Sequence, residues 1–277
     1  MGCELNWMAT DSRRDMQGKP GINLLRTSKI YTLDPETFKA LKATLNKMHP
    51  LGIMRGNKTI PDDVESFEIT LRDNLNGMLN IKVVLGDKLD VSSICYEKDV
   101  EGNLDVVDDT KRQSDWVFVS CHHHLSDGLN GQIPSKAVQT FAHQCIDGCA
   151  DGFLGSGPHQ IQGIEIYKGK PIFYSLPDFI QQHDLIPKTP QIFYEGFGLG
   201  FENTLMDAMD ERARTVFSRL YQHTAHAEGE VPISTFENHE VVDSKLYLVF
   251  LGFRKPRWQF GRPKLAEGEL AEKIIGR

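Results

Sequence analysis

The sequence predicts an α/β protein, and three neighbouring segments carry that prediction. Trp116–Cys121 is a dense apolar run of strand length, which is typical of a strand buried on both faces. A helix should follow from Pro134 to Gly148, a natural C-cap, and Gly152–Gly155 is then a short apolar strand. A strand, a helix and a strand within about forty residues form a βαβ unit, so we expect the two strands to be parallel. The apolar positions that recur at helical spacing are Ala137, Val138, Phe141, Ala142, Cys145 and Ile146.

The segments before this unit give weaker signals. Residues 1–21 indicate a loose lead-in, and Ile22–Leu33 is partly strand-like. Asp34 and Pro35 predict a helix start, because aspartate caps free N–H groups and proline already has the helical φ. The apolar face of that helix consists of Phe38, Leu41, Leu45 and Met48.

Short apolar runs separated by turn residues predict strands on both sides of the central unit. Upstream, we expect strands at Leu79–Leu85 and Val91–Tyr96, followed by a loop at Glu101–Asp109. Downstream, Ile161–Tyr167 and Ile172–Ser175 flank a short Lys-Gly turn and should form a hairpin.

The C-terminal third is less regular. Asn203–Tyr221 has apolar residues at helical spacing, which predicts a helix. Tyr221–Val231 is polar and indicates a loop, and Lys245–Phe253 has the apolar density of a strand.

The composition limits the functions open to the chain. Its 277 residues are 40% apolar and 25% charged, as is usual for a globular protein. No apolar run approaches the roughly 20 residues that a membrane helix needs. The net charge of −7 makes the chain a poor general binder of nucleic acid or of an anionic membrane. The five cysteines lack CxxC spacing and no signal-peptide pattern is present, so we expect reduced thiols and a cytoplasmic location.

Histidines gather at the two strand ends of the βαβ unit, where open α/β sheets bind their ligands. His122, His123 and His124 close the first strand, and His159 lies in the loop after the second. Because side chains alternate along a strand, His122 and His124 should point the same way and His123 the opposite way. Imidazole binds zinc, iron, nickel and copper. The candidate ligands of one divalent metal ion are therefore His122 and His124, which face the same way, and His159 on the neighbouring loop.

A long segment of the chain resembles the capsule-synthesis CapA proteins, also called poly-γ-glutamate synthesis proteins. Gln162–Leu176 matches the family pattern QGIEIYKGKPIFYSL throughout, and that run is highly specific. Gly155 and Gly157 belong to a second match and would let their loop approach its neighbours closely. The further matches are Ala142–Asp151 with AH-x-x-IDAGAD, Gly155–His159 with GHGPH or GHHPH, and Asp115–His124 with a strand that ends in HxH or HWG.

The resemblance implies a layered fold like that of calcineurin-type metallophosphatases, with sheets between helices. The implied domain covers residues 22–273, with a tail at 274–277, and the resemblance is strongest over residues 114–180. It implies metal-dependent hydrolysis or transfer on a small-molecule or polymer substrate, in the synthesis of poly-γ-glutamate or a capsule-like polymer. By position, His122, His124 and His159 would be catalytic metal ligands or line an anionic pocket, and Asp178 is a further catalytic candidate. Many members of the family are exported.

Three departures from the family pattern bear on activity. The family's N-terminal Gly-Asp strand and its Asn-Asn-His motif supply site residues and are not found, so we expect the chain to correspond to the C-terminal two thirds of a member, without its N-terminal strands. Ser156 stands where the family has histidine. Pro177 and Asp178 replace the glycine and asparagine of SLGNF, which fixes φ at one position and adds a charge at the next.

Other functions stay open at this point. With a degraded site, the chain would be a non-catalytic accessory or pseudoenzyme domain, marked by an unpaired sheet edge or an exposed apolar patch. The run from His122 to Gly128 also fits the HHxxxDG signature of acyl-CoA-dependent acyltransferases, in which His123 would be the general base. The histidine run could also be an accidental feature of a loop. We expect His143 to be structural, and the histidines expected on the surface are His49, His183, His223, His226 and His239.

Overall fold

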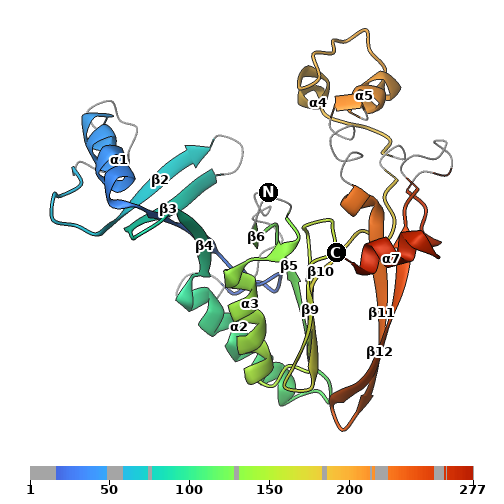
Figure 1. The fold of residues 1–277 in the computed structure, drawn as a ribbon. Coiled ribbons are helices and arrows are strands. Elements are labelled where there is room, and N and C mark those ends of the chain that lie inside the picture. Colours follow the sequence, from blue (N-terminus) through green and yellow to red (C-terminus); the bar gives the residue numbers. More distant parts are fainter. Residues whose placement is uncertain are drawn as a thin grey trace. The chain divides into compact units, whose positions relative to one another are not determined.

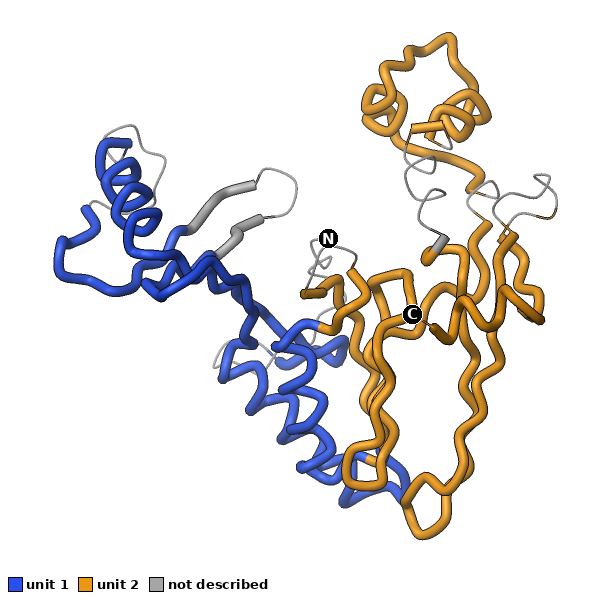
Figure 2. Tube along the Cα trace, viewed as in Figure 1, with its two compact units in different colours: residues 1–117, 135–150 blue, residues 118–134, 151–277 orange. Residues whose placement is uncertain are grey.

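The computed structural model describes residues 17–48, 59–73, 77–127, 131–182, 186–212, 214–215, 224–252, 259 and 261–276. The chain forms two compact units, which are described one at a time (Figure 2). The first unit contains residues 1–117 and 135–150, and the second contains residues 118–134 and 151–277. Both units contain helices and strands (Figure 1), which confirms the predicted α/β class. Within the described residues, no helix has the length and the hydropathy that a membrane span requires.

The first unit is built on a four-stranded mixed sheet with the strand order β2-β3-β1-β4. Its strands are β1 (Thr27–Leu33), β2 (Ser66–Asp73), β3 (Gly77–Leu85) and β4 (Asp90–Cys95). β1 runs parallel to β3 and antiparallel to β4, and β2 runs antiparallel to β3. β3 and β4 confirm the two strands predicted before the central unit, with small shifts of their ends.

Helix α1 (Pro35–Met48) follows β1 and begins where the sequence predicted. The Asp34 carboxylate accepts a hydrogen bond from the Thr37 backbone N–H at 3.0 Å. This bond satisfies one of the N–H groups that the first turn of a helix leaves free. The apolar face of α1 joins the sheet in one hydrophobic core, whose buried members are Phe38, Leu45, Ile60, Phe67, Ile69 and Val83.

Helix α2 (Glu97–Lys111) occupies the segment for which we expected a loop at Glu101–Asp109, so that prediction was wrong. The segment is rich in aspartate, asparagine and glycine, which are poor helix formers. Contacts with the N-terminal segment hold the helix instead. The Arg26 guanidinium donates to both carboxylate oxygens of Asp99 at 2.8 and 2.6 Å. The Asn103 side-chain amide donates to the backbone carbonyl of Leu24 at 3.0 Å.

Helix α3 (Lys136–Asp147) confirms the helix predicted in the βαβ unit, and within the first unit it packs against β4 and α2. It begins after Ser135 rather than at Pro134, because the Ser135 hydroxyl accepts a hydrogen bond from a first-turn N–H at 3.3 Å. Gly148 is the C-cap, as predicted, but the left-handed residue is Cys149, with a φ of 76°. The six apolar positions predicted to face the core are all buried.

The second unit contains a four-stranded sheet with the order β5-β8-β10-β9. Its strands are β5 (Phe118–His122), β8 (Gly152–Ser156), β9 (Ile164–Tyr167) and β10 (Lys170–Leu176). β5 and β8 are parallel, as predicted, while β10 runs parallel to β8 and antiparallel to β9. The predicted hairpin is also confirmed, since β9 and β10 join through Lys168 and Gly169, which both have positive φ.

In the described sheet, β5 is an edge strand and three of its five residues are exposed, so the prediction of a strand buried on both faces was wrong. Phe118 is 45% exposed, whereas Cys121 is buried. The Phe118 ring meets the Phe236 ring edge-on at a centroid distance of 5.9 Å. Apolar density therefore came from aromatic side chains that pack on other elements, and density alone does not distinguish an edge strand from a central one.

A long antiparallel hairpin of β11 (Glu228–Glu237) and β12 (Glu240–Phe250) stands beside this sheet in the second unit (Figure 1). β12 contains most of the strand predicted at Lys245–Phe253, but it begins earlier. The loop predicted at Tyr221–Val231 was wrong for its last residues, because β11 starts at Glu228. The charged residues of that stretch, which suggested a solvated loop, are buried in the strand.

Short elements complete the second unit. They are β6 (Ser126–Asp127), β7 (Ile133–Pro134), α4 (Gln191–Glu195), α5 (Leu205–Arg212), the 3-10 helix η5 (Thr224–Ala227), β13 (Lys264–Leu265) and α7 (Glu269–Ile275). β6 pairs with β7, and β13 pairs with β12. α5 confirms the first part of the helix predicted at Asn203–Tyr221, and residues 216–221 lie outside the described part of the chain.

Candidate functional site

The carboxyl ends of β5 and β8 lie side by side, as the sequence predicted. His122 ends β5 and is in register with Ser156 at the end of β8. His122 Nδ1 and Ser156 Oγ are 3.2 Å apart, and the His123 backbone N–H donates to the Ser156 carbonyl at 2.8 Å. These bonds hold together the two loops that leave the strands.

Three of the predicted site residues, His122, His124 and His159, meet at these loops and are called the histidine cluster below. The ring centroids of His122 and His124 are 5.1 Å apart, and those of His124 and His159 are 5.5 Å apart. His123 is only 8% exposed, while its two neighbours are exposed, which confirms the predicted alternation. The cluster is therefore open to a ligand from solvent.

Glycines bring the second loop against its neighbours, as predicted. A Cβ placed on Gly155 would lie 2.6 Å from the carbonyl carbon of Tyr174. A Cβ placed on Gly157 would overlap the carbonyl oxygen of His123, and the φ of Gly157 is +113°. A side chain at Gly155 would push β8 away from β10, and a side chain at Gly157 would push the loop after β8 away from His123.

Asp178, the fourth predicted site residue, lies beside His159. Its two carboxylate oxygens are 3.0 and 3.1 Å from His159 Nδ1, so the Nδ1–H donates to the carboxylate. This hydrogen bond raises the pKa of His159, against a smaller opposing effect of burial. Because Nδ1 is bonded to Asp178, the other nitrogen, Nε2, is the one that remains for a ligand.

His124 has the opposite electrostatic character. Partial burial lowers the pKa of His124, and positive charge on His122 or His159 lowers it further. A neutral imidazole carries a lone pair on one ring nitrogen, which can accept a proton or bind a metal ion. The cluster therefore combines His159, whose pKa is raised by Asp178, with His124, whose pKa is lowered chiefly by burial.

His123 is used inside the protein. Its Nε2–H donates to the Tyr174 carbonyl at 3.0 Å, and its Nδ1 accepts from the Leu125 backbone N–H at 3.3 Å. Burial lowers the pKa of His123, and both of its ring nitrogens are occupied. Since a general base needs a free lone pair near the substrate, this geometry contradicts the acyltransferase hypothesis, in which His123 was the base. Gly128 of that signature lies outside the described residues.

The donor chemistry of the histidine cluster suits a divalent transition-metal ion. Two imidazoles bound to one zinc ion at roughly 2.0–2.1 Å place their ring centroids roughly 5 Å apart, close to the 5.1 and 5.5 Å found between the rings. The hydrogen bond between Asp178 and His159 is of the kind that orients metal-bound imidazoles. Across the described parts of the chain, however, no group of three or more His, Cys, Asp or Glu side chains is already positioned to hold an ion. The residues fit a metal ion in type and in pairwise spacing, but they do not form a finished three-ligand site.

Two histidines that we expected on the surface have defined partners. His226 Nδ1 is 3.0 Å from the His159 carbonyl oxygen, so its N–H supports the backbone of the cluster. His239 Nδ1 and Lys170 Nζ are 3.1 and 3.0 Å from the same oxygen of Asp151, which is 2% exposed. The sequence signal that could have indicated the second contact is Asp151 itself, because a carboxylate in an apolar segment needs cationic partners when it is buried. The other histidines expected on the surface, His49, His183 and His223, lie outside the described residues.

Comparison with known proteins finds relatives that cover this site. The model of a family described as bacterial capsule synthesis protein PGA_cap matches residues 36–183, which include the histidine cluster and Asp178. Two uncharacterized proteins of Sinorhizobium fredii are each 26% identical over 279 residues, which cover 97% of this chain and 56% of each relative. A probable polyglutamine synthesis accessory protein of Mycobacterium tuberculosis is 35% identical over 88 residues, or 29% of this chain and 22% of that protein. The chain spans about half the length of the Sinorhizobium relatives.

Proposed function

The chain belongs to the PGA_cap family of bacterial capsule synthesis proteins, and from this premise we propose that it acts in the synthesis of poly-γ-glutamate or a capsule-like polymer. We propose further that the histidine cluster is a hydrolase or transferase site for a phosphate, ester or amide-bearing substrate, with a divalent metal ion as cofactor. The name of the M. tuberculosis relative refers to a related kind of polymer, which supports the first proposal.

The observation that carries this proposal is the meeting of three imidazoles at the carboxyl ends of two parallel strands. This edge is where open α/β sheets bind ligands. The ring distances of 5.1 Å between His122 and His124 and of 5.5 Å between His124 and His159 support the binding of one small ligand by this cluster. Loops that meet through glycine and strand-end hydrogen bonds keep these rings in place.

The hydrogen bonds and the burial of the cluster would leave ring nitrogens available for the ion. The Nδ1–H of His159 donates to Asp178, so a neutral His159 would bind through the lone pair of its Nε2. Burial lowers the pKa of His124, so its imidazole would readily lose the second proton and offer a lone pair to the ion. His122, His124 and His159 would hold the divalent ion, which supplies Lewis-acid polarisation of the substrate and a more acidic bound water.

The test is the metal content of the purified 277-residue chain, measured by elemental analysis beside a His122→Ala/His124→Ala double variant. The matched control is His143→Ala, which removes a half-buried imidazole from helix α3 in the other unit. We expect about one transition-metal ion per chain, lost in the double variant and retained in the control. Hydrolysis of p-nitrophenyl phosphate and of γ-glutamyl p-nitroanilide should then follow the metal content. A folded chain that holds no metal and hydrolyses neither compound refutes the catalytic proposal.

A second candidate function is that of a non-catalytic accessory protein in the same synthesis. It is supported by the lack of a preformed three-ligand group in the described residues and by Ser156, which stands where the family has a histidine. In that case the double variant should match the wild-type chain in every metal and hydrolysis measurement.

A further inference from the structure

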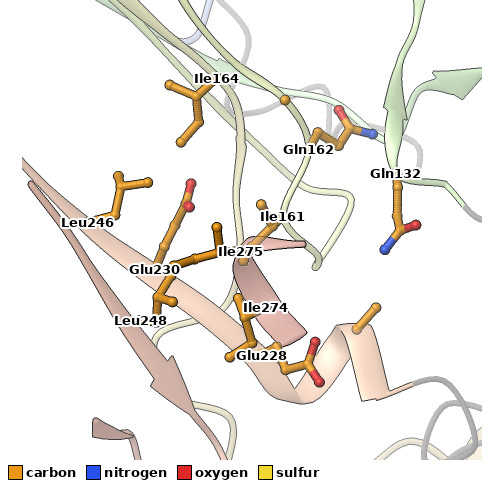
Figure 3. A pocket seen from close by; sticks show the side chains of 12 residues that line it. Gln132, Ile161, Gln162, Ile164, Glu228, Glu230, Leu246, Leu248, Ile274 and Ile275 are labelled. Carbon is orange, nitrogen blue, oxygen red and sulfur yellow. The ribbon is translucent and has the colours of Figure 1, made fainter. Parts of the chain in front are cut away.

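The second unit holds a cavity of about 240 Å³ that is lined by none of the cluster residues. It lies between the segment that leads into β9, the β11–β12 hairpin and helix α7 (Figure 3). Its walls are mainly aliphatic, and the apolar side chains are Ile161, Ile164, Leu246, Leu248, Ile274 and Ile275. A cavity with such walls suits the hydrocarbon part of a small molecule.

Two carboxylates from one face of β11 enter this apolar space. Glu228 and Glu230 are two residues apart in the strand, so their side chains share a face, and they are only 2% and 8% exposed. Glu228 is balanced by Lys273, whose Nζ lies 3.2 Å from its Oε1. Figure 3 shows the Glu230 carboxylate among the aliphatic side chains of the cavity, near Ile164 and Leu246.

In the described part of the chain, one oxygen of Glu230 lacks the partner that a buried carboxylate requires. Its Oε1 has no hydrogen-bond donor anywhere in the described residues, although it is shielded from solvent. Burial raises the pKa of Glu230 to about 7, so the carboxylate is charged at mildly alkaline pH. An isolated buried charge is costly, and a ligand that brings a positive charge and N–H donors would remove that cost.

A second buried acceptor lines the same cavity. The Gln162 amide nitrogen donates to the carbonyls of Leu125 and Gly131 at 3.3 and 2.8 Å, which fixes the orientation of the amide. Its Oε1 is buried and has no donor among the described residues. Glu230 and Gln162 therefore each offer the cavity an acceptor without a donor among the described residues, beside an aliphatic wall.

We propose that this cavity binds a small primary alkylammonium ion, with the ammonium group on Glu230 and the alkyl chain against the isoleucines and leucines. An ammonium group has N–H donors and one positive charge, which match a buried carboxylate oxygen without a donor better than a neutral ligand does. The site is separate from the histidine cluster, so the proposal does not depend on the proposed function.

The test is calorimetric titration of the full chain with n-hexylammonium chloride at pH 8, where Glu230 is ionised. We expect saturation at one ligand per chain and at least tenfold weaker binding by Glu230→Gln. The matched control is Glu237→Gln, which removes an exposed carboxylate from the far end of the same strand and should bind like wild type. The neutral probe n-hexanol should bind at least tenfold more weakly than the ammonium ion.

Each contrary result overturns the proposal. The proposal is wrong if wild type and Glu230→Gln bind hexylammonium with equal affinity. It is also wrong if hexanol binds as tightly as hexylammonium, or if the folded wild-type chain binds no hexylammonium. If Glu230→Gln does not fold, Ile275→Trp decides the matter, because Ile275 lines the cavity and is 72% exposed on α7. An indole there should reduce the space for the alkyl chain and weaken binding, and unchanged binding by this variant would contradict the site.

Discussion

Replacing Gly157 by alanine should pull the histidine cluster apart. Gly157 follows β8 directly, and its φ of +113° is a conformation that residues with a side chain rarely adopt. A Cβ at this position would overlap the carbonyl oxygen of His123 and would lie 2.8 Å from the carbonyl carbon and 3.1 Å from the backbone nitrogen of the same residue. Ordinary contacts begin near 3.4 Å, so the loop after β8 must move away from the loop after β5.

The free-energy cost of Gly157→Ala has two parts. Holding a non-glycine residue in such a backbone conformation costs about 1–3 kcal/mol, and overpacking a tight contact costs about 1–3 kcal/mol. A combined loss of about 3 kcal/mol would lower the melting temperature by about 6–12 °C in a chain of this size. The same movement should separate His159 from His124, because the two rings lie on the two loops that must part.

Thermal unfolding followed by circular dichroism measures the stability, and histidine resonances in NMR titrations report the cluster. The control is Gly102→Ala in α2, where a Cβ meets nothing within 4 Å and which should stabilise the helix by about 0.5–1 kcal/mol. If Gly157→Ala unfolds at the wild-type temperature with unchanged pKa values of the cluster histidines, the argument from close approach is refuted.

Three further variants test other parts of the structure. Asp178→Asn should lower the pKa of His159 toward the usual histidine value, as followed by NMR, whereas an unchanged value would show that the hydrogen bond has no effect. Ser135→Ala should lose the N-cap of α3 and about 1 kcal/mol of stability in urea unfolding, and an unchanged stability of Ser135→Ala would exclude a capping role. Burial raises the pKa of Glu230 from 4.5 to about 7, so the free energy of unfolding should fall as pH rises through that interval, by about 3 kcal/mol. Glu230→Gln should remove this part of the pH dependence, and an unchanged profile would show that Glu230 does not titrate in this range.

The elements that the sequence predicted correctly are those defined by local chemistry. Asp34 begins α1, a Lys-Gly turn closes the β9–β10 hairpin, and strand alternation separates His123 from the histidines on either side. The errors arose where distant residues decide the outcome. α2 depends on the contact of Arg26 with Asp99, and Glu230 is buried by elements far along the chain.

In the candidate site, too, local features could be predicted and contacts between distant residues could not. The spacing of the histidines around two strand ends was sufficient to predict that they meet. The partners of the cluster could not be predicted so easily, because His226 reaches it from the segment before β11, far along the chain. Whether the rings hold a metal ion depends on distances of a few tenths of an ångström, which no pattern of residue types specifies.

The contact of Lys170 and His239 with Asp151 anchors the turn of the β11–β12 hairpin. His239 lies in the turn of that hairpin, and the Val241 N–H also donates to the Gly169 carbonyl in the turn between β9 and β10 at 2.8 Å. The hairpin is thus anchored to the neighbouring sheet at its turn, while Glu228 and Glu230 line the cavity at its opposite end. A hairpin that is already fixed at its turn loses less conformational freedom when its other end contacts a ligand, which favours binding of an alkyl chain in the cavity.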